Sequence, residues 1–82
     1  MILCLAHNGV FYTLSDREGF VRGRVMEEKF GDRSIWSWSY LEPDGPFLSK
    51  LITRGGVESF EDALCSVLNQ YAEEAYRMGS GG

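Results

Sequence analysis

The chain has little of several features that commonly mark a function class. Its 82 residues include one histidine, two cysteines and two prolines, and eight basic residues against twelve acidic ones. It contains no Cys-x-x-Cys pair, no His-Glu-x-x-His, no Gly-x-Ser-x-Gly and no Walker glycine loop. We therefore expect no catalytic residue, no metal site and no cofactor, and we predict that the protein is not an enzyme.

Long apolar runs are also missing. No stretch approaches the roughly 20 apolar residues that span a bilayer, and the apolar start at residues 1–6 is too short for a signal peptide. We expect a cytoplasmic protein without a membrane anchor, in which Cys4 and Cys65 are buried, reduced thiols. The net charge of −4 argues against non-specific binding to nucleic acid and is compatible with a basic partner.

One helix is strongly predicted, over residues 60–77. Its apolar side chains recur at steps of three and four, which places them on one stripe of the helix. The stripe consists of Phe60, Leu64, Val67, Leu68, Tyr71 and Ala75. Ser59 is placed to cap the first turn, where Glu61 and Asp62 complement the helix dipole. Gly79 is placed to end the helix in a left-handed conformation.

Before the helix, the sequence predicts a run of short antiparallel strands. Apolar or alternating segments bounded by turn residues indicate strands over residues 2–6, 10–14, 20–28, 34–41 and 47–53. Asn8 and Gly9 give a strong hairpin signal, and Gly23 predicts a bulge or a close backbone approach. We predict a two-layer α+β domain over residues 1–78, in which a four- or five-stranded antiparallel sheet packs on the one C-terminal helix. Residues 79–82 are predicted to form a flexible tail.

One helix covers one face of such a sheet, so the other face is left to solvent or to a partner. In the fourth predicted strand, alternation places Trp36, Trp38 and Tyr40 on the side covered by the helix. Ser37 and Ser39 then lie on the open face. The alternative is that the three aromatic side chains form a recognition surface, because a shift of one residue exchanges the two faces.

Charged side chains are the predicted contacts with a partner. Alternation in the third predicted strand places Arg22 and Arg24 on the open face. The outer face of the helix offers a second, acidic patch. The predicted partner-binding residues are Arg22, Arg24, Glu27, Glu28, Glu61, Glu73 and Glu74. An ordinary solvated surface of mixed charge is the alternative for both groups. Acidic residues interleave with the arginines and cancel their charge, so we do not expect nucleic acid as a direct ligand.

Two resemblances bear on function. Residues 56–64, Gly-Val-Glu-Ser-Phe-Glu-Asp-Ala-Leu, are similar to the strand-to-helix junction of HicB-like antitoxins. That resemblance implies a module that neutralises a toxin. In size, acidity and architecture, the whole chain resembles the small inhibitor proteins of phages and mobile elements, including those of the anti-CRISPR type. This second resemblance implies a viral, non-enzymatic inhibitor that occupies a functional surface of a host complex.

The sequence therefore predicts a binding protein that inhibits a host macromolecular complex through protein–protein contact in the host cytoplasm. Three alternatives stay open. The chain is an antitoxin-like module, a small nucleic-acid-binding module, or a structural homodimer that pairs through a sheet edge or through the open face.

Overall fold

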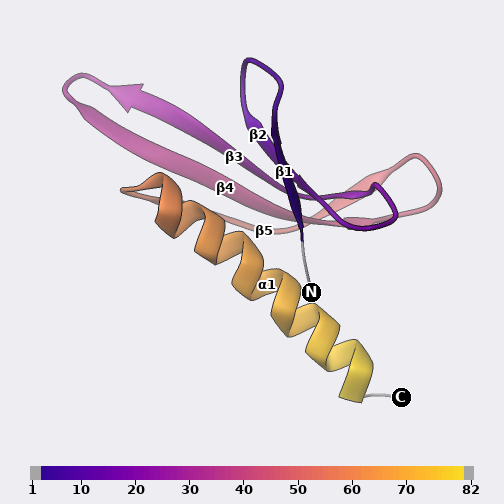
Figure 1. Cartoon of the computed structure of the whole chain (residues 1–82). Coiled ribbons are helices and arrows are strands. Elements are labelled where there is room, and N and C mark those ends of the chain that lie inside the picture. The colour runs from indigo at the N-terminus through magenta and orange to yellow at the C-terminus, as the bar shows by residue number, and fades with distance from the viewer. Residues whose placement is uncertain (1–2, 81–82) are drawn as a thin grey trace.

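The computed structural model describes residues 3–80 and consists of a five-stranded antiparallel sheet and one helix (Figure 1). The elements are β1 (Cys4–His7), β2 (Tyr12–Ser15), β3 (Val21–Phe30), β4 (Arg33–Pro43), β5 (Ser49–Val57) and α1 (Phe60–Ser80). The strands lie in the sheet in chain order, so a hairpin joins each strand to its neighbour, and β1 and β5 are the edges. The predicted two-layer α+β architecture is confirmed.

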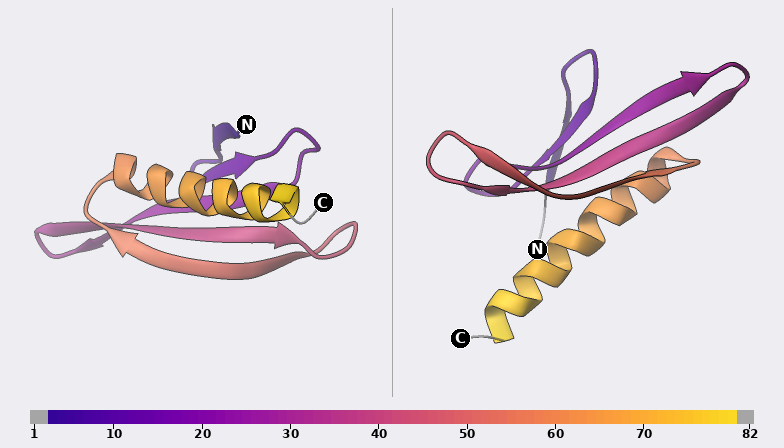
Figure 2. Two further views of the ribbon diagram at one scale, coloured as in Figure 1. Left: turned by 90° about the horizontal axis from the view of Figure 1, so that it is seen from below. Right: turned by 180° about the vertical axis from the view of Figure 1, so that it is seen from behind.

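The two layers meet on one face of the sheet. The helix α1 packs mainly on β4 and β3. Seen from below in Figure 2, it lies in front of the strands. The twist of the sheet carries the β1–β2 hairpin away from the helix, as Figure 1 shows. One face of the sheet is therefore covered by α1, and no element in residues 3–80 covers the other.

The core lies between α1 and the central strands. Its buried side chains are Leu14, Val25, Tyr40, Ala63 and Val67. Trp36 and Trp38 pack against this cluster, so the predicted core role of the aromatic residues of β4 is confirmed. Ser37 and Ser39 alternate with them and lie on the open face.

The start of α1 is fixed by a cap and by aromatic packing. The hydroxyl oxygen of Ser59 accepts a hydrogen bond of 3.1 Å from the backbone N–H of Asp62, so the predicted cap is confirmed. The ring of Phe60 lies 4.6 Å from that of Tyr12 and 5.1 Å from that of Trp36, measured between ring centres. The first turn is therefore held to both β2 and β4.

Gly23 marks a close approach of the helix to the sheet. A β-carbon at this position would overlap Cγ1 of Val67 and would lie 3.2 Å from its Cγ2. The strand ladder is also irregular here, because Leu14 pairs with Gly23 while Ser15 pairs with Val21. Arg22 is left over as the extra residue of a β-bulge. Both features predicted from Gly23 are present.

The strand β5 begins and ends later than predicted. It includes Arg54, Gly55 and Gly56, which follow the predicted end of the strand at residue 53. Gly55 pairs with Trp38, and a β-carbon at Gly55 would lie 3.0 Å from the Trp38 indole. The aromatic ring thus occupies the space that a side chain in this strand would need.

The predicted end of the helix at Arg77 is wrong, because α1 continues through Gly79 to Ser80. A glycine costs a helix only about 1 kcal/mol relative to alanine, which is too little to stop a helix of 21 residues near its last turn. Of the predicted tail, residues 79–80 belong to α1, and residues 81–82 lie outside the described part of the chain.

Three apolar side chains predicted to be buried face solvent instead. Cys4 and Cys65 are exposed free thiols, and Leu68 is 42% exposed. Cys4 lies on the edge strand β1, which has a neighbour on one side only. Ala63 takes the buried place on α1 that the predicted stripe omitted. The stripe facing the sheet is therefore rotated slightly from the predicted one.

Candidate functional site

The sheet face opposite α1 forms a groove of about 870 Å³, called here the open-face groove. It runs across β3, β4 and β5. Its apolar side chains include Phe11, Met26, Phe30, Ile35, Leu41 and Leu51. Its polar side chains are Arg24, Glu28, Ser37, Ser39 and Arg54.

Strand register explains why these side chains share one face. Arg24 of β3 lies opposite Ser39 of β4, and Ser39 lies opposite Arg54 of β5. Residues directly opposite each other in antiparallel strands point to the same side of the sheet. Arg24, Ser39 and Arg54 therefore form one transverse line, called here the arginine row. Met26 and Ser37 form the next pair along the groove.

The groove leaves apolar surface uncovered. Phe30 is 60% exposed and Leu51 is 49% exposed. Leu41 is only 8% exposed, although it does not belong to the core cluster under the helix. A connected apolar surface rimmed by polar groups is typical of a binding site on a small soluble domain.

The two arginines of the groove carry charge that no side chain in the described part of the chain neutralises through an ion pair. Arg22 and Arg33 each have an acidic partner, but Arg24 and Arg54 have none. The guanidinium carbon of Arg24 lies 5.4 Å from the centre of the Phe11 ring, a cation–π contact that holds the side chain against the groove wall. The groove is therefore both apolar and locally basic.

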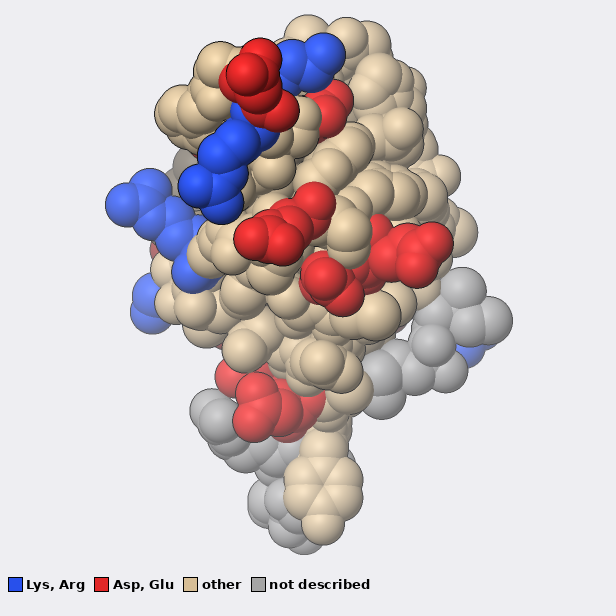
Figure 3. Space-filling model, turned by 90° about the vertical axis from the view of Figure 1, so that its left-hand side faces the viewer, with Lys and Arg blue, Asp and Glu red and all other residues tan. Residues whose placement is uncertain are grey.

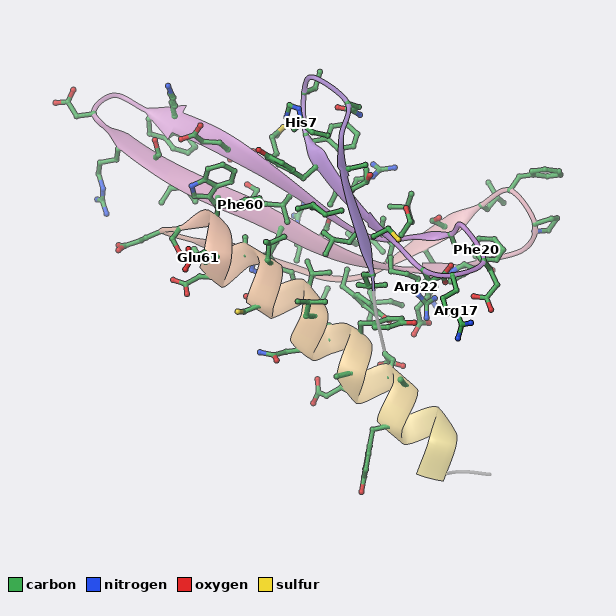
Figure 4. All side chains as sticks on the ribbon, viewed as in Figure 1. His7, Arg17, Phe20, Arg22, Phe60 and Glu61 are labelled. Atoms are coloured by element: carbon green, nitrogen blue, oxygen red, sulfur yellow. The ribbon has the colours of Figure 1, made fainter. Side chains whose placement is uncertain are left out.

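The prediction that Arg22 shares the open face with Arg24 is wrong. The bulge in β3 turns Arg22 toward α1, where its guanidinium carbon lies 5.2 Å from the centre of the Tyr71 ring. Its Nε lies 3.6 Å from Oδ2 of Asp16, and its side chain is 14% exposed. Figure 4 shows Arg22 on the helix side of the sheet. Arg22 therefore links β3 to the helix.

Glu74, another predicted contact, also lies on the covered side. Its carboxyl group lies close to that of Glu42 near the end of β4. Burial is the main cause that raises the pKa of Glu42 above its usual value, and Glu74 raises it further. Tyr40 is fully buried beside this pair, and its hydroxyl has no hydrogen-bond partner among the described side chains. Burial likewise raises the pKa of Tyr40.

The other predicted contacts do not form one surface. Glu28 lines the groove, whereas Glu27 lies opposite Trp36 and so on the helix side of β3. Glu61 and Glu73 are exposed on α1, and Glu61 points away from the sheet in Figure 4. Figure 3 shows the end of the molecule with the β3–β4 turn and the start of α1, where an acidic side chain lies among the basic ones at the top and other acidic side chains gather below them. Of the seven predicted residues, the structure brings only Arg24 and Glu28 into the groove.

Two polar residues that the sequence reasoning missed are important in the structure. Arg54 lies just beyond the predicted end of its strand, although its position opposite Ser39 completes the arginine row. Asp16 organises the β2–β3 loop, since its Oδ1 accepts hydrogen bonds of 3.0 Å from the N–H groups of Glu18 and Phe20. The Asp-x-x-Gly spacing that ends at Gly19 was the available signal for this turn.

Comparison with protein-family models, with curated proteins and with solved structures gave no match to this chain. Among the described residues, no three His, Cys, Asp or Glu side chains are placed to share a metal ion. Within residues 3–80, no helix combines the length and the apolar character that a membrane span needs. The candidate site is therefore the open-face groove, defined by its own geometry.

Proposed function

We propose that this protein is a binding module that holds a protein partner in the open-face groove and acts by contact, without chemistry of its own. The observation that carries the proposal is the groove itself, which has a volume of about 870 Å³ and a mainly apolar lining across three strands. A pre-formed groove of this kind binds without a large ordering cost. A small domain with one free sheet face is suited to such a role.

The chemistry of the groove favours a protein over a nucleic acid. Single-stranded nucleic acids stack their bases on exposed aromatic rings. Here, Trp36 and Trp38 pack against the core under the helix. The groove has two phenylalanine rings, Phe11 and Phe30, beside four aliphatic side chains, Met26, Ile35, Leu41 and Leu51. Aliphatic side chains of this kind match the apolar side chains of a protein partner. The net charge of −4 points the same way.

An inhibitor of the anti-CRISPR type would use such a groove to cover a functional surface of a host complex. A HicB-like antitoxin would use it to cover a toxin. Both roles stay predictions, because they depend on which protein the groove binds. The proposal of protein binding through this face is common to both.

The test is affinity capture with matched variants. The tagged protein is used to recover partners from a bacterial lysate that contains CRISPR effector complexes, followed by mass spectrometry. The groove variant carries Ile35→Glu and Leu51→Glu, which place charge on apolar groove positions. Arg17→Gln is the control, because Arg17 is exposed in the β2–β3 loop, outside the groove. Urea denaturation checks that all three proteins are folded.

We expect one protein in stoichiometric amount with the wild type and the control, and its loss with the groove variant. Recovery of a CRISPR effector subunit in this pattern would support the inhibitor role. Equal recovery with the groove variant would contradict the proposal. If Glu61→Lys and Glu73→Lys then abolished recovery, the interface would lie on α1 instead.

A further inference from the structure

The arginine row brings two like charges to one place in the groove. Neighbouring strands lie about 4.8 Å apart, so the Cα atoms of Arg24 and Arg54, two strands apart, are about 10 Å from each other. Ser39 lies between them. The guanidinium group of Arg24 lies against the Phe11 ring, on the side of β3 away from Ser39. An arginine side chain is longer than half of the separation between the two Cα atoms, so both guanidinium groups can reach one anion above the Ser39 hydroxyl when that of Arg24 turns from Phe11 toward β4. The planar guanidinium fork matches a carboxylate in particular.

No acidic side chain of the groove is close enough to neutralise this row. Glu28, the one carboxylate in the groove lining, lies opposite Ile35. It is four residues along β3 from Arg24, which corresponds to about 13 Å in a strand. Arg24 and Arg54 form no ion pair with any side chain that the structure describes. Because like charges beside an apolar surface repel one another more strongly than in water, an incoming anion is favoured there.

Apolar side chains flank the row on both sides. Leu41 and Leu51 form the pair beyond it in one direction, and Met26 and Ile35 follow in the other. A small inorganic anion would leave these flanks in water. An extended protein segment that lies along β4 presents every second side chain to the groove, about 6.6 Å apart. Such a segment can place a carboxylate on the row and apolar side chains on both flanks.

We propose that the open-face groove selects an acidic, apolar protein segment, in which an aspartate or glutamate binds between Arg24 and Arg54. Apolar residues two positions before and after that acidic residue lie on the flanks of the row. This inference rests on the proposed function and adds to it the chemistry of the partner. The resulting motif is apolar-x-acidic-x-apolar in an extended conformation.

The test is selection of random 12-residue displayed peptides on the immobilised full chain. The double variant Arg24→Gln with Arg54→Gln serves for counter-selection. We expect the enriched peptides to carry Asp or Glu with apolar residues at two-residue spacing. Synthetic copies should bind each single variant about tenfold or more weakly, the effect of losing a charge-assisted hydrogen bond. They should bind the Arg17→Gln control as tightly as the wild type.

Folding of each variant is checked by its urea denaturation midpoint. Arg24, Arg54 and Arg17 are all exposed, so we expect the midpoint of the wild type in every case. An unchanged midpoint assigns any loss of peptide binding to the lost arginine itself.

Three results would overturn the inference. The first is enrichment of peptides without acidic residues, whose binding is lost with Ile35→Glu but not with the arginine variants. That result would leave the proposed function intact and would show that the groove does not select an acidic residue. The absence of any peptide enriched over the counter-selection would refute the motif. Tight, salt-sensitive binding of a 12-nucleotide oligo-dT that depends on Arg24 and Arg54, without peptide binding, would make the row a phosphate site.

Discussion

Adding one methyl group at Gly23 tests how closely α1 packs on β3. In Gly23→Ala the new carbon would overlap Cγ1 of Val67 and would lie 3.2 Å from Cγ2 and 3.3 Å from Cβ. Val67 is fully buried and has little room to turn away, so the helix must shift. Overpacking of this kind costs about 1–3 kcal/mol. The reduced entropy of the unfolded chain returns about 0.4–1 kcal/mol, so the midpoints of the two ranges leave a net loss of about 1.3 kcal/mol.

A double-mutant cycle separates this clash from other effects. Val67→Ala alone should cost about 2–3 kcal/mol, from two lost methyl groups and the cavity that they leave. In the double variant the alanine at position 23 fills part of that cavity. We expect a combined loss smaller than the sum by about 0.5–3 kcal/mol.

The assay is urea denaturation followed by tryptophan fluorescence, because Trp36 and Trp38 both pack against the core under α1. Two outcomes would refute the reasoning. An unchanged midpoint for Gly23→Ala would show that a side chain fits between β3 and the helix. Strictly additive losses would show that Gly23 and Val67 do not touch.

Three other changes probe the packing and the buried polar groups. Phe60→Ala should lower the free energy of unfolding by about 2–5 kcal/mol, because its ring packs on two other aromatic rings; an unchanged urea midpoint would contradict that packing. Because the pKa of Glu42 is raised in the folded state, stability should fall as pH rises from the usual carboxyl range through the raised pKa, and then level off. Glu42→Gln should flatten this profile and stabilise the protein at neutral pH, as measured by thermal unfolding across the acidic-to-neutral range; a profile as steep as that of the wild type would rule out Glu42 as its source. Tyr40→Phe removes a buried hydroxyl that has no partner among the described side chains, so it should leave stability unchanged or raise it by about 1–3 kcal/mol. A clear loss in the urea midpoint of that variant would mean that the hydroxyl forms a hydrogen bond.

The parts of the fold that the sequence predicted well are those with local signals. The Ser59 cap of α1 depends on residues within one turn of it. The hairpin at Asn8 and Gly9 depends on a dipeptide, and Gly9 has a φ of 95°. The faces of β4 follow from strict alternation between aromatic residues and serines. Each of these signals can be read without knowing what lies across the sheet.

The candidate site was harder to predict because it depends on register between strands. The orientation of Arg22 is set by a bulge, which exists only in the pairing of β2 with β3. The place of Arg54 depends on the pairing of Gly55 with Trp38, whose ring occupies the space that a side chain at position 55 would need. A period-2 pattern assigns Arg22 to the wrong face as soon as one residue is inserted. The groove can therefore be identified only from the register of three neighbouring strands.

The order of the elements has a consequence for how the protein is made. All five strands precede α1 in the chain, and each strand pairs with the one before it. On a ribosome, the hairpins can form one after another as they emerge. The aromatic side of β4, however, stays exposed until Ala63 and Val67 have been synthesised and the helix can dock. For that interval both faces of the sheet are apolar and open, so the nascent chain is most prone to aggregate before α1 docks. Truncation before Phe60 would make that state permanent.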